Sequence, residues 1–136
     1  MPANFAPVFP LTPNIAFAKL TTANTATDGT GTVATIFTAG TFGARLDKVV
    51  ARPLGTNVAS VARFFLNNGS ATTTATNNTL IAELDLPAST SGSAASIGAV
   101  LEIAFDTSLP AGWKLLVVIG TTVATGWQFT SIGGDY

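Results

Sequence analysis

The chain has 136 residues, with 6 Lys+Arg against 7 Asp+Glu, a formal net charge of -1, and no histidine or cysteine. This length is typical of one domain. Without histidine and cysteine there can be no Ser-His-Asp or Cys-His nucleophile, no thiolate or imidazole zinc site and no disulfide framework.

The composition predicts a surface made mostly of neutral groups. Charged residues make up only 10% of the chain and hydrophobic residues 47%, whereas an ordinary soluble domain has about 25% charged residues. Threonine, serine, asparagine and glycine must therefore cover the outside. Such a surface repels its own copies weakly, so we expect part of it to be hidden in a lasting assembly. The near-neutral balance also argues against nucleic acid as a partner.

The first 14 residues are apolar and rich in proline, holding four of the seven prolines of the chain. Proline lacks the backbone donor and pushes the preceding residue toward extended geometry, so residues 1–14 are predicted to form an extended arm. The arm either covers an edge of its own domain or docks on a neighbouring subunit or another protein. The candidate contact residues are Phe5, Pro7, Val8, Phe9 and Pro10. No basic segment precedes an apolar one here, so we expect no secretory signal and a chain that stays where it is made.

From Ile15 onward the apolar period is two, which predicts strands and a single β-sandwich domain over residues 15–136. Turn-forming Gly, Asn, Asp and Pro residues separate the apolar segments. The predicted strands are Ile15 to Leu20, Val33 to Thr38, Arg45 to Arg52, Val58 to Asn67, Leu80 to Leu86, Ile97 to Phe105, Trp113 to Ile119 and Thr125 to Ile132.

The last two predicted strands are apolar enough to suggest burial on both faces or at an interface. Together they form a stretch without charge, Leu115 to Gly134, that has the length of a membrane span. Its threonines and glycines make insertion unfavourable, so we interpret it as two strands and expect no membrane partner.

Eight short antiparallel strands predict an all-β, two-sheet β-sandwich that resembles a jelly roll. An immunoglobulin-like sandwich is the alternative. Two longer polar stretches without charge, Ala71 to Thr79 and Pro87 to Ser96, are predicted to be surface loops on one end of the domain.

Few residues could carry chemistry. Glu83 and Asp85 lie two apart in one predicted strand, and Glu102 and Asp106 lie four apart in or beside another, so carboxylates could meet across a sheet as glycoside hydrolysis requires. With seven acids in all, a solvated polar face explains them better. No calcium-binding spacing is present. We therefore predict no catalytic residue, no cofactor and no metal, and a protein that is not an enzyme.

Three other groups have a structural interpretation beside a functional one. The segment Asp28 to Thr32 is interpreted as a turn rather than a phosphate loop, because it lacks the Gly-Lys-Ser/Thr ending and no helix follows. Four cations, Arg45, Lys48, Arg52 and Arg63, indicate either a salt-bridged face between neighbouring strands or a patch for a partner. Four aromatic residues, Trp113, Trp127, Phe64 and Phe65, indicate core positions or a platform for stacking sugars.

Several segments resemble the capsid decoration, or cement, proteins of tailed bacteriophages. They are Gly29 to Phe37, Arg45 to Val50, Leu54 to Asn57, Phe65 to Gly69, Leu109 to Trp113 and Gly133 to Tyr136. The resemblance implies a β-sandwich or jelly-roll subunit that forms homo-oligomers, commonly trimers, and clamps neighbouring major capsid protein subunits. It also implies synthesis in the host cytoplasm and a place on the outer capsid surface of the virion. A tail or fibre module that contacts host glycans is the alternative.

Overall fold

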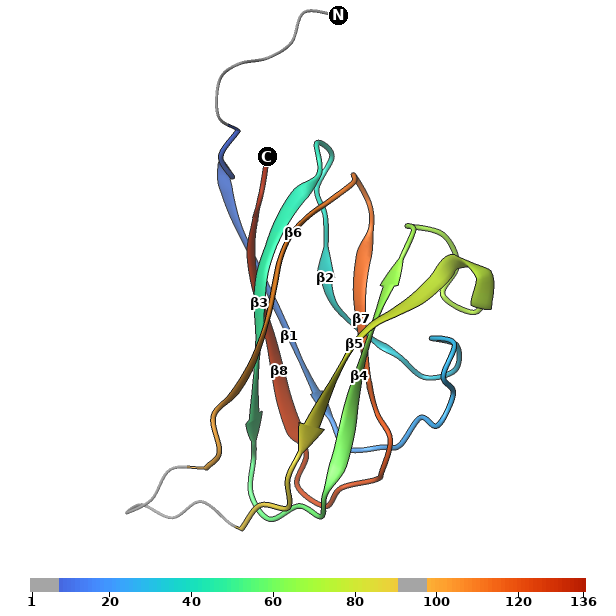
Figure 1. Cartoon of the computed structure of the whole chain (residues 1–136), viewed down its shortest axis with the longest axis vertical. Helices are drawn as coiled ribbons and strands as arrows, with labels where there is room; N and C mark the ends of the chain where they lie inside the picture. The colour runs from blue at the N-terminus through green and yellow to red at the C-terminus, as the bar shows by residue number, and fades with distance from the viewer. Residues whose placement is uncertain (1–7, 91–97) are drawn as a thin grey trace, which may run out of the picture.

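The computed structural model describes residues 8–90 and 98–136. Two antiparallel four-stranded sheets pack face to face as a sandwich, as Figure 1 shows, and this confirms the predicted fold class. The elements are β1 (Thr12–Leu20), β2 (Ala34–Thr38), β3 (Ala44–Pro53), β4 (Ser60–Asn67), the 3-10 helix η1 (Ala75–Asn77), β5 (Asn78–Leu86), β6 (Leu101–Leu109), β7 (Lys114–Ile119) and β8 (Trp127–Asp135).

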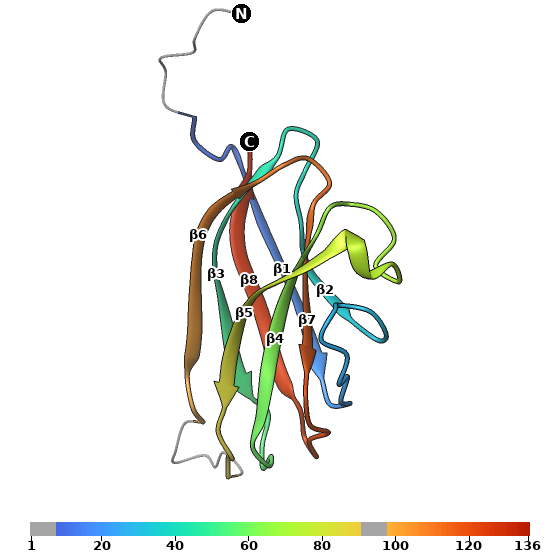
Figure 2. The ribbon, with the colours of Figure 1, turned by 45° about the vertical axis from the view of Figure 1, so that its right-hand side comes forward.

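The strand order is that of a jelly roll. One sheet has the order β1-β8-β3-β6 and the other β2-β7-β4-β5, which can be followed across both layers in Figure 2. The first strand therefore pairs with the last, the second with the seventh, the third with the sixth and the fourth with the fifth. The chain runs as one long antiparallel hairpin rolled into two layers. An immunoglobulin-like sandwich would place the first strand beside the second, so that alternative is wrong.

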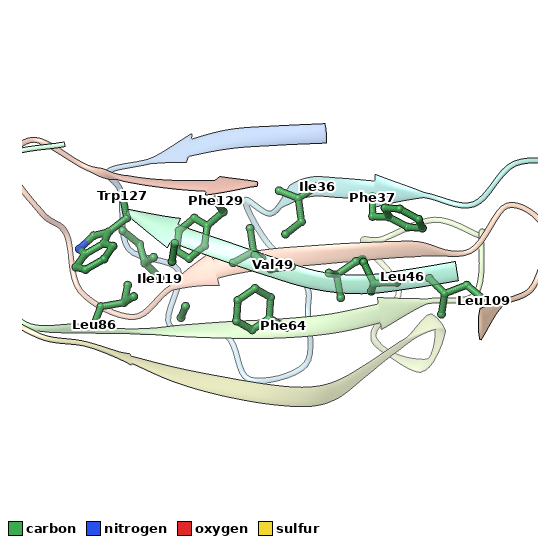
Figure 3. Packing of buried hydrophobic residues seen from close by; sticks show 14 of the residues in the cluster. Ile36, Phe37, Leu46, Val49, Phe64, Leu86, Leu109, Ile119, Trp127 and Phe129 are labelled. Carbon is green, nitrogen blue, oxygen red and sulfur yellow. The ribbon is translucent and has the colours of Figure 1, made fainter. Parts of the chain in front are cut away.

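The core lies between the two sheets, because alternate side chains of each strand point inward. Phe64 of β4 packs edge to face against Phe105 of β6, with ring centroids 5.7 Å apart, and against Phe129 of β8 at 6.1 Å. Trp127 closes one end of the same cluster, as Figure 3 shows. Aromatic residues from both sheets thus hold the layers together.

β7 is buried on both faces, as predicted for the seventh strand. Leu115, Val117 and Ile119 belong to the central core. Leu116 and Val118 point the other way and form a second cluster with Phe65, against which Val33 packs. β8 is different, since buried residues such as Trp127, Phe129 and Ser131 alternate with half-buried ones. The stretch that has the length of a membrane span therefore forms two sandwich strands, and none of the described residues lies in a helix able to cross a membrane.

β6 and β8 both end later than predicted. β6 spans Leu101–Leu109 rather than Ile97 to Phe105, although Ile97 lies outside the described residues. The ladder with β3 stops at Ala51↔Leu101, because Pro53 has no backbone donor to extend it. At the other end a bulge, with Asp106 at φ 47°, lets the strand continue past the residue where we expected it to stop. β8 continues to Asp135.

The two long polar stretches lie at opposite ends of the domain, so their placement on one end is wrong. Ala71 to Thr79 leads into β5 and Pro87 follows its last residue, Leu86. Consecutive connections of one strand necessarily leave from its two ends, and Figure 1 shows them far apart. Residues 91–96 of the second stretch lie outside the described part of the chain.

A buried asparagine, Asn57, ties three connections together at the end of the sandwich opposite the chain termini. Its side-chain Nδ2 donates to the Gly126 carbonyl at 3.0 Å. Its Oδ1 accepts from the backbone N–H of Thr125 at 2.9 Å and of Gly126 at 3.0 Å. Its backbone exchanges two hydrogen bonds with Ser89. One side chain therefore satisfies buried backbone groups that no strand partner reaches.

We expect Asn57→Ala to lower the free energy of unfolding by about 2–4 kcal/mol, because the N–H groups of residues 125 and 126 would lose their acceptor and the Gly126 carbonyl would keep only the Leu54 N–H as a donor. Urea unfolding followed by circular dichroism measures this. Asn68→Ala is the matched control at an exposed turn, where we expect a loss below about 1 kcal/mol. Equal losses for the two variants would contradict the role given to Asn57.

Candidate interaction surface

β1 presents apolar side chains to the outside. It lies at the edge of its sheet, and within the described residues its only ladder partner is β8. Ala18 and Leu20 point inward and pack against the core. The alternate residues Ile15 and Phe17 point outward and are 60% and 71% exposed. Exposed apolar side chains on an edge strand mark a candidate interaction surface.

The described part of the arm is attached to its own domain through its backbone. The Leu11 N–H donates to the Asp135 carbonyl at 2.7 Å. Pro10 lies over Gly134, where an added Cβ would be 2.7 Å from the Cβ of Pro10. The absence of a side chain at residue 134 therefore leaves room for the arm to follow the sheet.

Of the five predicted contact residues, the structure describes Val8, Phe9 and Pro10, while Phe5 and Pro7 lie outside the described residues. Val8 is 63% and Phe9 69% exposed. The arm therefore combines an anchored backbone with apolar side chains that contact little of their own domain. The arm predicted from the sequence ends at residue 14, whereas β1 begins at Thr12. A proline is tolerated inside this strand because the strand lies at a sheet edge.

The ion-paired residues of the same sheet belong to β3 and β6, on its other half. Lys48 Nζ of β3 is 3.1 Å from Glu102 Oε2 of β6, and Arg45 bridges Asp47 at 2.8 Å and Asp106 at 3.5 Å. In the second sheet, Arg63 of β4 pairs with Glu83 of β5 at 2.9 Å. The salt-bridged face is confirmed for these three cations. Arg52 has no carboxylate within 4.0 Å in the described part of the chain.

The four carboxylates considered for hydrolysis do not come together. Glu83 and Asp85 point outward from β5 in one sheet, since Ala82 and Leu84 between them pack against the core. Glu102 and Asp106 belong to β6 of the other sheet, where Leu101 and Ile103 point inward. The two pairs therefore lie on opposite outer faces of the sandwich. No cluster of three acidic side chains able to hold a metal occurs among the residues that the structure describes.

The aromatic residues are core residues, as the structural interpretation predicted. Trp127, Phe64 and Phe65 are fully buried. The indole N–H of Trp127 finds no acceptor among the described residues. Trp113 is half-buried and packs against the same cluster. These four side chains therefore do not form an exposed platform for stacking sugars.

The segment Asp28 to Thr32 is a turn, as predicted. The Asp28 carboxylate accepts hydrogen bonds from the Thr30 hydroxyl at 2.6 Å and from the Thr30 N–H at 3.0 Å. The hydroxyl bond first, and the backbone bond second, lower the pKa of Asp28 below its ordinary value of 3.8. The Thr30 N–H thus already donates to the Asp28 carboxylate and is not available to a phosphate.

We expect Thr30→Val to raise the pKa of Asp28 toward its ordinary value, because the stronger of the two hydrogen bonds is removed. A titration followed by the carboxyl carbon signal in NMR measures the shift. A lowered pKa in the folded state means that the stabilisation is complete above the unfolded pKa and is lost as pH falls through the folded one. Thr27→Val, at an exposed neighbour, should leave the pKa unchanged, and an unchanged pKa in Thr30→Val would contradict the assignment.

Comparisons with protein-family models, with curated proteins and with solved structures found no match.

Proposed function

We propose that this chain is a non-enzymatic structural protein of a tailed-bacteriophage virion that decorates the outer capsid surface and stabilises the shell. In this proposal it binds across neighbouring major capsid protein subunits and acts as a homo-oligomer, with a trimer favoured by the resemblance. The observation that carries the proposal is the exposure of Val8 and Phe9 on an arm whose next residues are anchored to the sandwich.

The anchored arm suits a clamp. Binding through a freely moving segment loses affinity because the segment must be ordered. Here Pro10 and Leu11 already lie against β8, so fewer residues remain to be ordered when the side chains of Val8 and Phe9 are buried. Pro10 further restricts the backbone next to these side chains.

The rest of the surface is compatible with shell decoration. Three of its six cations, Arg45, Lys48 and Arg63, form ion pairs within the chain, which leaves little charge for phosphate groups. An interface of about 800 Å² per partner is enough for specific binding, and many copies on one shell let modest contacts add up.

The alternative, a tail or fibre module that contacts host glycans, would need an exposed Trp113 or Trp127 to stack on sugars. Trp127 is buried and Trp113 packs against the core, so the structural observations favour the capsid-decorating function.

Removing residues 1–9 should abolish binding to expanded, undecorated phage shells, because the exposed apolar part of the arm is lost while Pro10 and Leu11 stay in place. Co-sedimentation with shells measures occupancy, and circular dichroism should show an unchanged β fold. A point variant, Val8→Ser with Phe9→Ser, should weaken binding in the same direction. Each buried apolar side chain contributes about 1.5–3 kcal/mol, so the double variant should bind at least about 100-fold more weakly.

Val58→Ser is the matched control, since Val58 is similarly exposed at 58% but lies outside the arm and β1. It should bind shells like the unmodified chain. Full occupancy by the truncated chain would contradict the proposed role of the arm. Binding to host polysaccharide, with no binding to shells by the full chain, would favour the tail or fibre alternative.

A further inference from the structure

We propose that the outward face of β1 is the surface through which copies of this chain associate with one another. The surface consists of Leu11, Pro13, Ile15 and Phe17, which we call the β1 stripe. Its members occupy alternate positions, so from Pro13 onward their side chains leave the same face of the strand. The proposal rests on the homo-oligomer of the proposed function and names its contact surface. It concerns the chain in solution without shells, so its failure can be told apart from a failure to bind shells.

The β1 stripe is large enough to drive association. Leu11 is 83% exposed, and Ile15 and Phe17 are 60% and 71% exposed. Together with Pro13 they expose on the order of 400 Å² of mostly apolar surface, a size at which exposed patches mark interaction sites. Two such stripes, with their neutral flanks, would bury on the order of 1,000 Å² in total, which is the lower bound for a specific interface.

The flank of the stripe is uncharged along Ile15 and Phe17. The β8 neighbours of Pro13, Ile15 and Phe17 are Gly134, Ile132 and Thr130. One charged side chain lies beside the other end of the stripe, since Asp47, which is ion-paired with Arg45, lines the hollow next to Leu11 and Pro13. Of the residues on the outward face of β1, only Lys19, at the far end of the strand, is charged. Copies can therefore meet along Ile15 and Phe17 without desolvating an ion pair.

A second copy is the occupant that the surface fits best, because the same apolar stripe on two copies supplies the area that a specific interface needs. The remaining exposed large hydrophobic residues of the described chain are scattered over turns and other strands: Phe42, Leu54, Val58, Leu80, Ile81 and Val100, beside Val8 and Phe9 of the arm. Among the described residues, none of these side chains belongs to a line of exposed apolar residues as long as the β1 stripe. Apolar stripe against apolar stripe is therefore the contact that removes most apolar surface from water.

The geometry of the β1 stripe is compatible with both a dimer and a trimer. A stripe that runs along a strand can lie parallel to a rotation axis, so the same residues of two or three copies can meet around it. The trimer favoured under the proposed function is one such arrangement. The near-neutral net charge of -1 per chain adds little repulsion between copies.

The test is the solution mass of the full chain by light scattering during size-exclusion chromatography at micromolar concentration. The unmodified chain should elute as a stable multimer. The double variant Ile15→Lys with Phe17→Lys should elute as a single chain, with association weakened at least about 100-fold, because two apolar contacts per copy are lost and like charges are placed opposite each other.

Phe42→Lys is the matched control, because Phe42 is 83% exposed but lies at the turn between β2 and β3. It should keep the multimer, and circular dichroism with thermal unfolding should show that every variant is folded. A single-chain mass for the unmodified protein would overturn the proposal. A multimer that survives the double lysine variant would also overturn it. A monomer whose shell binding is lost in the double variant would assign the stripe to the capsid protein instead, and would equally overturn association between copies.

Discussion

The contact between the two apolar sheet faces is the interaction on which the rest of the structure depends. Phe64 from one sheet meets Phe105 and Phe129 from the other, and Trp127 and Leu86 extend the contact toward one end. The chain has no cysteine and, in its described part, no cluster that could hold a metal. Hydrophobic burial and backbone pairing must therefore provide the stability of the fold. The same contact buries Phe64 and Trp127, so neither is exposed for stacking on a ligand.

Asparagine side chains hold the connections between the strands in place. Asn57 holds three loops at one end of the sandwich. Asn78 donates to carbonyls of Asp28 and Thr72, and Asn24 donates to those of Thr30 and Thr32. An amide both donates and accepts without carrying charge, so it can satisfy the backbone in a chain with few ions. Ser131 ties the two sheets together in the same way, donating to the carbonyl of Ile36 across the core. The connections of the sandwich are therefore held by neutral side chains.

Much of the fold could be predicted from the sequence, because the period of two and the turn residues are local signals. The alternation in β5 and β6 located those strands and their outward carboxylates to within a few residues. The end of β6 could not be predicted, since a bulge at Asp106 depends on the partner strand. The start of β1 could not be predicted. The prolines of residues 1–14 suggested an arm up to Asn14, whereas pairing with β8 extends β1 back to Thr12. Exposure of Ile15 and Phe17 follows from strand order, which no local pattern encodes.

We propose the N-terminal edge, from the arm through β1, as the surface through which this protein contacts its partners. Hydrogen exchange of backbone amides, compared for the free chain and for the chain bound to shells, tests this most directly. We expect added protection at Val8 and Phe9 on shells, equal protection of β1 in both samples because copies already cover it in the free multimer, and little change in the connections around Asn57 at the opposite end. Protection confined to those connections, with Val8 and Phe9 exchanging as in the free chain, would contradict this assignment.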